Sequence, residues 1–457
     1  MNYTQALSRV VAGLRAEDLR PDVCEAAKKS LLDWIGVSLG AVNDPGVRIL
    51  IDIVNEMGGK KQSSILGYGL KTTLLNAALV NGAMSHALDY DDAHSGVRTH
   101  PSAPMIPALL SAGEHLKVPG KDLIAALVAG FEVTVRIGYA LGKDYYERGW
   151  HATPILGRFG AAAGAARLLG LDVEQTAVAL GLAATQASGL RDAFGTMSKP
   201  FHAGKAAMDG LLSALLAQKG FSGPGDVLGP ESGFARVFTD AYDPRRILAE
   251  PEGGHLILGT NFKPYAACLL THPAIDGMIT LQRDHDLEPG SISEIDISVA
   301  PFNLEVTGNR TPKDGREAKF SMAAATALAL IHGRATESVF SDKVVDEPRT
   351  RALIDKILTT PVDGFAETEA EVKVKLYDGR SYGMHVTTPK GDPGNPMSFD
   401  EIADKTRDLI KRTLSSGDAE KIVETVRGLE GLADTARLVR LCCAGRGRLK
   451  TPQVVER

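Results

Sequence analysis

Residues 21–37 read PDVCEAAKKSLLDWIGV, and the apolar side chains of this stretch recur at intervals of three and four positions. That spacing aligns them on one face of a helix, because an α-helix turns once every 3.6 residues. The aligned positions are Val23, Ala27, Leu31, Trp34 and Val37. The stretch therefore predicts a helix with one buried face.

The same spacing recurs through about residue 260. Alanine and leucine are abundant and β-branched residues are few in the segments that repeat it, which are 74–88, 104–116, 121–141, 156–169, 174–189 and 204–218. We therefore expect this long region to be an all-helical domain. Residues 160–166 read GAAAGAA, and such small side chains let two helices approach closely. A membrane dimer motif is the weaker alternative, because no long apolar span surrounds the run.

The pattern changes after about residue 266. Apolar and polar residues alternate at 295–299, 372–376 and 381–386, which is the period of half-buried strands. Asp378 and Gly379 tolerate positive φ between the last two runs and predict an antiparallel hairpin. Helices near 318–332 and 347–358 should cover this small sheet.

The C-terminal part is predicted to be helical again. A turn-rich boundary at 389–396 precedes Ser398 and Glu401, whose spacing is that of a capping box. A final helical region should follow, to about residue 443. At 457 residues the chain exceeds what one core usually organises, so two domains are expected.

Composition excludes several classes of function. The formal net charge is -5 and the basic residues are spread along the chain, so nucleic acid is not an expected partner. The four cysteines form no paired framework and no CxxC spacing, which is typical of reduced thiols in a cytoplasmic protein and leaves a metal site without sulfur ligands. No basic segment precedes an apolar run at the N-terminus, and no stretch reaches about 18 consecutive apolar residues, so secretion and membrane spanning are not expected.

The densest polar run is residues 89–102, DYDDAHSGVRTHPS, where a small-residue helix gives way to a loop. Three carboxylates and two imidazoles this close would raise or split one another's pKa values, which is how acid/base sites obtain groups that titrate near neutrality. The alternative is a solvated acidic loop with incidental histidines. A calcium loop is disfavoured, because the run lacks the alternating D-x-D-x-D-G pattern and its distal glutamate.

Two further clusters lie near predicted helix starts. His151 follows an aromatic run, and the free N–H groups of a helix start favour a neutral imidazole; a hydrogen-bonded histidine in an aromatic core is the alternative. Lys199 precedes Pro200, a residue favoured in the first turn, so the same partial charges favour a neutral amine that could act as a base. Alternatively, Lys199 and Lys205 are ordinary surface cations. No GxSxG, HExxH, P-loop or strand-linked GxGxxG pattern accompanies these clusters.

Taken together, an ordered set of short motifs resembles the MmgE/PrpD family. The motifs are LDYDD at 88–92, THPS at 99–102, RGWH at 148–151, SKPFHAG at 198–204, FKPY at 262–265, THPA at 271–274 and AKFS at 318–321. Each is short, and their order along nearly the whole chain is what makes the set specific. The family includes 2-methylcitrate dehydratase, cis-aconitate decarboxylase and iminodisuccinate epimerase.

The resemblance implies a mainly α fold with a smaller α+β domain. Its members have a large all-helical domain built from both chain ends, here 1–266 and 396–457, and an inserted α+β lid, here 267–395. They are usually homodimers. The small-residue helices also suggest faces that need a partner copy, so a homodimer is expected.

The resemblance also implies a set of site residues in the pocket between helical domain and lid, which are Asp89, His100, His151, Lys199 and His272. Lys199 and His100 are the expected proton-transfer pair, with Asp89 raising the basicity of a neighbouring histidine. His151 and His272 would bind substrate carboxylates or carry a proton to the leaving group.

Four more residues complete the expected site. Tyr146 is similar to a tyrosine of the epimerase branch and is the possible second acid/base on the opposite face. Asp92, His202 and Lys205 are expected to bind substrate.

The expected chemistry needs neither a metal nor an organic cofactor. The protein must then supply both a base and the charges that stabilise a carbanion or enediolate beside a carboxylate. The predicted activity is that of a lyase on a small di- or tricarboxylate, namely a dehydratase similar to 2-methylcitrate dehydratase. The alternatives are an epimerase or racemase of a dicarboxylate such as iminodisuccinate, and a catalytically inactive helical binding protein.

Two positions depart from many members of the family. Ala93 stands where they have threonine, and Ala324 where a tyrosine is common five positions after the lysine of the Lys-Phe-Ser motif. Each change removes a hydroxyl, and a missing buried hydrogen-bond partner commonly costs about 1–3 kcal/mol. The reaction class survives these changes better than either 2-methylcitrate or cis-aconitate as the named substrate.

Overall fold

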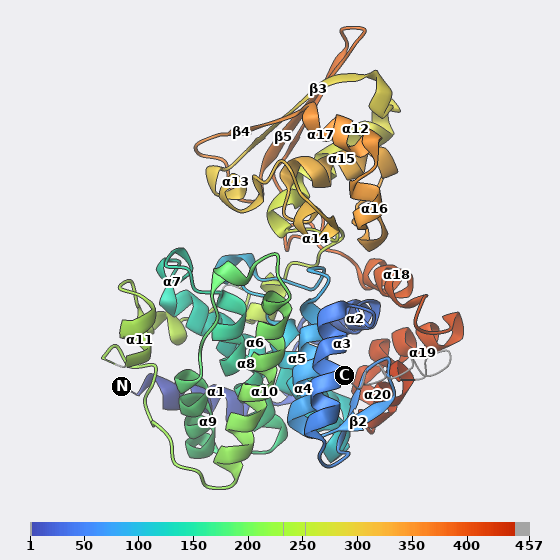
Figure 1. The fold of residues 1–457 in the computed structure, drawn as a ribbon. Helices are drawn as coiled ribbons and strands as arrows, with labels where there is room; N and C mark the ends of the chain where they lie inside the picture. Colours follow the sequence, from blue (N-terminus) through green and yellow to red (C-terminus); the bar gives the residue numbers. More distant parts are fainter. Residues whose placement is uncertain (1, 232, 252, 444–457) are drawn as a thin grey trace. The chain divides into compact units, whose positions relative to one another are not determined.

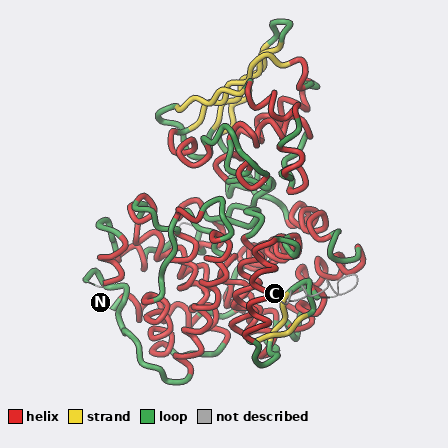
Figure 2. The backbone as a smooth tube through the Cα atoms, in the orientation of Figure 1, coloured by secondary structure: helices red, strands yellow, loops and turns green. Residues whose placement is uncertain are grey.

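The computed structural model describes residues 2–231, 233–251 and 253–443. Its chain forms two compact units, one of Met1–Thr260 with Ser398–Arg457 and one of Asn261–Met397. The first unit is mostly helical, and the second combines helices with a four-stranded sheet (Figures 1 and 2). The expected mainly α fold with a smaller α+β part is therefore confirmed, whereas the lid role of the second unit stays a prediction.

The helices of the first unit follow the predicted segments closely. They are α1 (Tyr3–Gly13), α2 (Pro21–Gly40), α3 (Pro45–Met57), α4 (Leu74–His86), α5 (Ser102–Leu116), α6 (Gly120–Leu141), α7 (Asp144–Glu147), α8 (Ala152–Leu168), α9 (Val173–Thr185), α10 (Ser198–Gln218), α11 (Gly233–Phe238), α18 (Phe399–Ile410), α19 (Ser416–Arg427) and α20 (Ala436–Cys442). Helix α10 begins six residues earlier than the periodicity alone indicated, so Lys199 and Pro200 lie in its first turn.

Glycines bring α4 and α10 almost backbone to backbone. A Cβ on Gly82 of α4 would lie 2.8 Å from the Cα of Gly204, and a Cβ on Gly204 would lie 2.2 Å from the carbonyl oxygen of Leu79. Any larger side chain would force these helices apart, which would also move the end of α4 away from the start of α10. The approach therefore sets the spacing of the polar groups described below.

The GAAAGAA run packs inside the same unit. A Cβ on Gly160 of α8 would meet Thr134 of α6, and one on Gly164 would meet Leu109 of α5. The alanines of the run are fully buried. The predicted close helix approach is confirmed, but it occurs within one chain and offers no face to a second copy. The homodimer stays a prediction that this run does not support.

The first unit is not entirely helical, so that part of the prediction is wrong. An antiparallel hairpin pairs β1 (Ser63–Ile65) with β2 (Leu70–Thr72). Side chains of neighbouring helices hold it, since Glu114 accepts a hydrogen bond from the Ser64 amide at 2.7 Å and Asn81 donates to the Ser64 carbonyl at 2.9 Å. Strands of three residues are too short to produce an alternating pattern in the sequence.

Helix α6 has the length and apolar composition of a membrane span, yet 94% of its most apolar window is buried within the protein. Its neighbours are α8, α5 and α2 of the same unit. This is the environment of a core helix.

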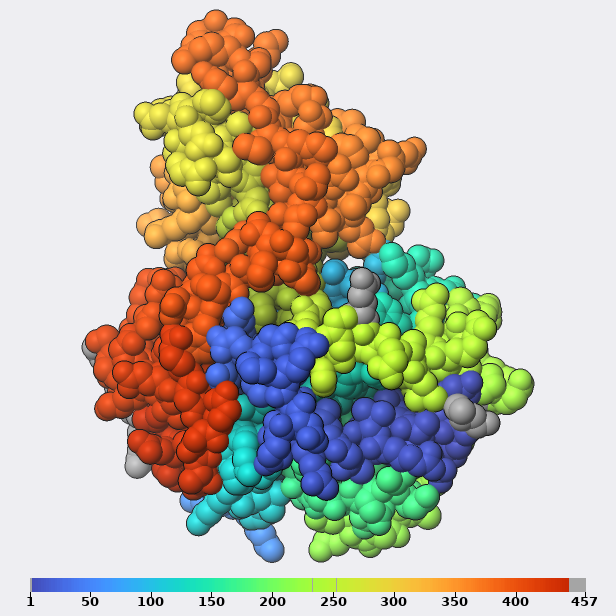
Figure 3. Space-filling view, turned by 180° about the vertical axis from the view of Figure 1, so that it is seen from behind, coloured from blue at the N-terminus to red at the C-terminus, as the bar shows by residue number. Residues whose placement is uncertain are grey.

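The C-terminal helices pack against the N-terminal part of the chain, and Figure 3 shows orange-red and blue residues side by side on this unit. Helix α18 begins with the predicted capping box of Ser398 and Glu401. Its Lys405 ammonium donates to the Asp33 carboxylate of α2 at 2.6 Å and to the Tyr90 carbonyl at 2.7 Å. A residue from the far end of the sequence therefore anchors the loop that carries Asp89 and Asp91.

The second unit is a four-stranded sheet with helices against it. The strands are β3 (Ile292–Val299), β4 (Ile357–Pro361), β5 (Ala370–Leu376) and β6 (Ser381–Val386), and the helices are α12 (His272–His285), α13 (Pro301–Thr307), α14 (Gly315–Ala318), α15 (Met322–His332), α16 (Asp342–Val345) and α17 (Pro348–Asp355). The strand order is β4-β3-β5-β6, parallel between β3 and β4 and antiparallel elsewhere. Helix α12 packs on β5 and β6, and α15 packs on β4.

The sheet confirms the predicted hairpin and adds one strand. Gly379 has a φ of 90° in the turn between β5 and β6. The helix predicted for 347–358 ends at Asp355, and β4 follows it. This edge strand escaped notice because its residues are mostly exposed and carry polar Thr359 and Thr360, so no apolar alternation marks it.

Candidate active site

Four imidazoles form a row at the ends of four helices of the first unit. His86 ends α4, His151 caps the start of α8, His202 lies in the first turns of α10, and His100 lies just before α5. The ring centroids of His86 and His100 are 4.6 Å apart, those of His86 and His151 6.1 Å, and those of His151 and His202 5.4 Å. We call these four residues the histidine row. The close approach of α4 and α10 brings its members together from distant parts of the sequence.

The carboxylate of Asp91 lies against one end of the row. Its Oδ2 atom is 2.8 Å from Nδ1 of His86 and 3.2 Å from Nδ1 of His100. Burial opposes ionisation of this carboxyl group, yet the two imidazoles hold its pKa well below the usual range. Asp91 is therefore an anion that both rings can contact.

Burial keeps two members of the row neutral. It lowers the pKa of His86 to about 4; the Asp91 carboxylate opposes this shift, while Lys199 and His100 add to it. Burial likewise holds the pKa of His151 well below its usual range, assisted by His86 and Lys199. The neutral His151 expected from its place at a helix start is confirmed, although desolvation is the main cause. Neutral imidazoles can accept protons at physiological pH.

Lys199 and Asp89 form a buried ion pair beside the row. Their side chains are 7% and 9% exposed, and the Lys199 ammonium donates to Oδ1 of Asp89. Asp89 has a φ of 52°, so a left-handed turn after α4 directs this carboxylate. Lys199 also lies 5.3 Å from the ring centroid of Phe194, whose ring packs edge-on against His151. A carboxylate thus engages the amine that the sequence had suggested would be free to act as a base.

Two guanidinium groups lie over the ring of Tyr146 of α7. The carbon at the centre of the Arg191 guanidinium lies 4.3 Å from the ring centroid of Tyr146, and that of Arg98 lies 5.3 Å away. Arg191 also donates to the Tyr146 carbonyl at 3.1 Å. The His151 amide donates to the Gly189 carbonyl at 3.0 Å, so the segment of Gly189 and Arg191 contacts both Tyr146 and one member of the row, His151.

With this geometry in hand, comparison with known proteins is informative. Residues 5–247 match the model of the MmgE/PrpD N-terminal domain, and residues 265–431 match that of the MmgE/PrpD C-terminal domain. The chain belongs to the MmgE/PrpD family.

Similar proteins agree with the family assignment. The chain is 31% identical to the cis-aconitate decarboxylase-like protein oryM of Aspergillus oryzae, over 96% of this chain and 97% of that protein. It is 28% identical to cis-aconitate decarboxylase of Aspergillus terreus, over 96% and 95%, and 27% identical to that of Homo sapiens, over 96% and 94%. The family and these relatives support a lyase-type function.

Most of the predicted site residues lie in the first unit. His100, His151, His202, Asp89 and Lys199 belong to the row or to the ion pair beside it. His272 belongs to the second unit, where its Nε2 atom lies 3.3 Å from the Ala267 carbonyl. Its predicted role with the others remains a prediction, as does the acid/base role of Tyr146.

Two predicted substrate-binding residues have structural partners. Burial raises the pKa of Asp92 to about 8, and both of its oxygens accept hydrogen bonds from Ser102 at the start of α5. Lys205 pairs with Asp209 four residues along α10, and Asp209 also accepts from Arg158 at 3.0 Å. These contacts stabilise helix ends and the interior; substrate binding by either residue remains a prediction.

Sequence reasoning missed His86 and Asp91. His86 had a usable signal, since it stands three residues before Asp89 at the end of a small-residue helix. Asp91 had none, because three aspartates within four residues look alike in sequence. In the structure Asp89 meets Lys199, Asp91 meets His86 and His100, and Asp92 meets Ser102. Asp91 therefore contacts two imidazoles, and the histidine-orienting role predicted for Asp89 stays a prediction.

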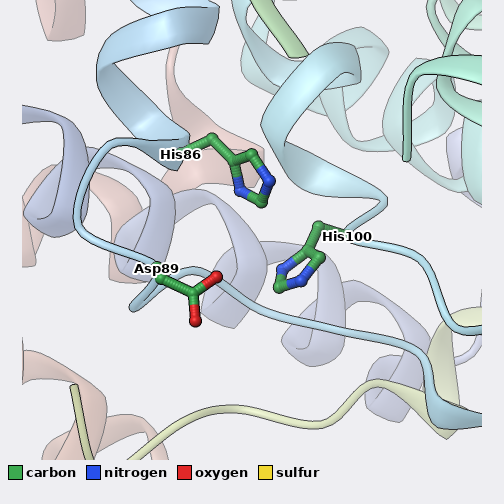
Figure 4. Close-up of side chains that lie close together, drawn as sticks. All are labelled: His86, Asp89 and His100. Carbon is green, nitrogen blue, oxygen red and sulfur yellow. The ribbon is translucent and has the colours of Figure 1, made fainter. Parts of the chain in front are cut away.

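The side chains of His86, Asp89 and His100 point toward one another (Figure 4). One ligand atom from each of His86, Asp89 and His100 lies within 4.8 Å of the others. Two imidazoles and a carboxylate could hold a divalent ion. Lys199 already neutralises the carboxylate, however, and its ammonium would repel a second cation at this place. Acid/base chemistry therefore remains the role predicted for Asp89 and His100.

Proposed function

We propose that this chain is a lyase that transfers protons at a carbon beside a carboxylate of a small di- or tricarboxylic acid. The observation that carries the proposal is the buried Lys199–Asp89 pair set against neutral imidazoles. It combines a fixed positive charge with groups that accept protons. Membership of the MmgE/PrpD family supports the same reaction class.

The difficult step in such reactions is the formation of a carbanion or enediolate. Removing a proton beside a carboxylate places a second negative charge on an anionic substrate, so nearby cations and N–H donors must stabilise the transition state. Lys199 supplies the cation, and the histidine row supplies proton acceptors and donors. A site sheltered from water strengthens each of these electrostatic contributions.

Decarboxylation of a cis-aconitate-like acid is the first reaction to test. The three relatives compared above are cis-aconitate decarboxylases or a similar protein. Dehydration of 2-methylcitrate, the activity expected from the sequence, is the second. Ala93 and Ala324 are both buried. Because their side chains are methyl groups, neither position provides the hydroxyl group that many family members have there. This difference favours an acid related to cis-aconitate or 2-methylcitrate but with other substituents.

Epimerisation is a second candidate, which Tyr146 favours. Two guanidinium groups lie within 5.3 Å of its ring centroid, and their positive charge would stabilise a phenolate formed during proton transfer. An epimerase needs one group to remove the proton and another to return a proton to the opposite face. Inverted stereochemistry with deuterium at the same carbon, and no loss of water or carbon dioxide, would select this candidate.

Proton NMR in deuterated water tests the proposal. The purified protein is incubated with cis-aconitate, citrate, 2-methylcitrate and iminodisuccinate, while released carbon dioxide is measured in parallel. Loss of carbon dioxide with one solvent deuterium in the product identifies a carboxy-lyase. Loss of water with a new carbon–carbon double bond, and deuterium only in substrate that has exchanged its proton, identifies a hydro-lyase. Lys199→Met serves as the inactive control. Folded protein that neither turns over nor exchanges a proton on any of these acids would reject the proposal in favour of a binding protein.

A further inference from the structure

One carboxylate oxygen is shared by two members of the histidine row. Oδ2 of Asp91 lies 2.8 Å from Nδ1 of His86 and 3.2 Å from Nδ1 of His100. Asp91 is fully buried, and the His100 side chain is 15% exposed. The two rings meet edge to face, with an interplanar angle of 64°. Nδ1 of His86 is hydrogen-bonded to this oxygen, whereas Nδ1 of His100 faces the same anion at ion-pair distance but outside hydrogen-bond geometry.

This arrangement selects one tautomer of each ring. A neutral imidazole carries its proton on one nitrogen and a lone pair on the other, and an anionic acceptor holds the proton on the nitrogen that faces it. Nδ1 of each ring should then carry hydrogen, and Nε2 should be the basic atom. Nε2 of His86 is buried and meets no hydrogen-bond donor or acceptor on any residue that the structure describes. That atom is thus not tied to an alternative partner.

We propose that Asp91 and His86 are positioning residues for His100, holding it as the Nδ1–H tautomer so that its Nε2 atom is the proton acceptor of the site. This inference rests on the proposed function and refines it, because it names His100 as the member of the histidine row that acts as the base. Lys199, paired with Asp89, then supplies positive charge.

His86 has a defined part in this arrangement. Its Nδ1–H takes the shorter contact with Oδ2 and leaves the anion oriented toward His100. Its ring also packs edge-on against His100 and limits how far that ring can turn. The charged and titratable groups around the pair are Asp89 on the same loop, Lys199 on α10 and His151 on α8. Asp91 is the carboxylate that lies within 3.2 Å of Nδ1 of both rings.

Histidine NMR tests the tautomer without any substrate. Protein labelled with ¹⁵N-histidine gives long-range ¹H–¹⁵N spectra in which a protonated and an unprotonated ring nitrogen have distinct shifts. We expect His86 and His100 to carry hydrogen on Nδ1 at neutral pH, and His100 to shift toward the Nε2–H form in Asp91→Asn. Glu114 is a buried carboxylate at the far end of α5. Glu114→Gln should leave the tautomers of both rings unchanged. An Nε2–H form of His100 in the wild type would overturn the proposal.

Kinetics on the acid that the wild type turns over provide a second readout. Asp91→Asn should lower kcat about 10²–10⁴-fold with KM changed less than about threefold, because a wrong tautomer removes the base without removing a binding contact. His86→Asn places an amide N–H near the Nδ1 position, so it should retain at least about tenfold more activity than His86→Leu. Equal kcat in these two variants would overturn the part assigned to His86.

The proposed function and the positioning role of Asp91 can be rejected independently of each other. A wild type without turnover on any acid rejects the proposed function, while the tautomer spectra still test the arrangement of Asp91 and His100. A wild type with turnover whose kcat and His100 tautomer survive Asp91→Asn rejects the positioning role alone. If Asp91→Asn does not fold, the His86→Asn and His86→Leu pair decides the matter by the same spectra and rates.

Discussion

Buried carboxylates lie at both ends of helix α5, and they differ in how many hydrogen-bond donors contact them. At the C-terminal end, Glu114 accepts from the Ser63 hydroxyl, the amide and hydroxyl of Ser64, and Lys71, at 2.7–3.0 Å. At the N-terminal end, Asp91 is equally buried, but its Oδ1 atom meets no donor on any residue that the structure describes.

This contrast separates a structural site from a functional one. Buried polar atoms in native proteins almost always have partners, and the exceptions call for an explanation. Glu114 holds the β1–β2 hairpin to α5, and both of its carboxylate oxygens accept hydrogen bonds in doing so. The Asp91 end carries unsatisfied atoms on both the carboxylate and His86, which is expected where groups are held ready for a substrate or a proton.

The largest effect should come from Lys199 at the Asp91 end. Lys199→Met removes the positive charge that the transition state needs and leaves Asp89 without its partner, so turnover should fall about 10³–10⁴-fold. Lys199→Arg keeps the charge and should stay within about tenfold of the wild type if Lys199 is a cation and not the base. Steady-state rates on the accepted acid check both values. Equal losses in the two variants would restore Lys199 as the base.

The matched change at the other end should affect stability alone. Glu114→Gln replaces one acceptor oxygen by a donor that faces the Ser63 and Ser64 donors, which should reduce the free energy of unfolding by about 1–3 kcal/mol. Its kcat should equal that of the wild type. Denaturant unfolding and turnover are measured on the same preparation. A loss of kcat above about threefold in folded protein would break the distinction between the two ends.

The pH dependence of stability should also reflect the Asp91 end. Buried His86, whose pKa falls from 6.5 to about 4, resists protonation when folded, so its contribution is present above pH 6.5 and is lost as pH falls toward 4. Burial shifts the pKa of His151 in the same direction. Asp92, whose pKa burial raises to about 8, acts oppositely and loses its contribution as pH rises toward 8.

These shifts predict that stability is greatest near pH 6.5, with a decline on the alkaline side of up to about 2 kcal/mol by pH 8. Unfolding midpoints in denaturant across this range provide the measurement. Asp92→Asn cannot ionise and should flatten the alkaline decline. An unchanged decline in that variant would show that Asp92 is not its source.

The smallest expected effect is that of metal removal. Dialysis against EDTA should leave turnover unchanged, because Lys199 already occupies the carboxylate of the one cluster of potential ligands found in the described residues. The rate before and after dialysis checks this. Complete loss of turnover, restored by one divalent ion, would reassign His86, Asp89 and His100 to a metal site.

Local patterns in the sequence predicted the architecture well. Helical spacing identified the long helices, and Ser398 with Glu401 marked the start of α18. The two hairpin strands of the first unit and the edge strand β4 escaped, because three residues or a polar edge produce no alternation. The resemblance brought in His100, His151 and Lys199, which the structure gathers at converging helix ends.

The different partners of the three aspartates could not be predicted from the sequence. Asp89, Asp91 and Asp92 differ in partner because a left-handed turn at Asp89 and the anchoring of Tyr90 by Lys405 rotate successive carboxylates in different directions. Lys405 lies more than three hundred positions away in sequence. No short motif contains that contact, so pairwise roles within a polar run require the fold.

The most direct test of a proton-transfer site at the start of α5 is a side-by-side measurement of solvent-deuterium incorporation into the accepted acid. Wild type, Asp91→Asn and Glu114→Gln are compared at equal concentrations of folded protein. We predict that Glu114→Gln incorporates deuterium at the wild-type rate while Asp91→Asn is slower by about 10²–10⁴-fold. Incorporation at the wild-type rate by Asp91→Asn, or equal losses in both variants, would contradict the account.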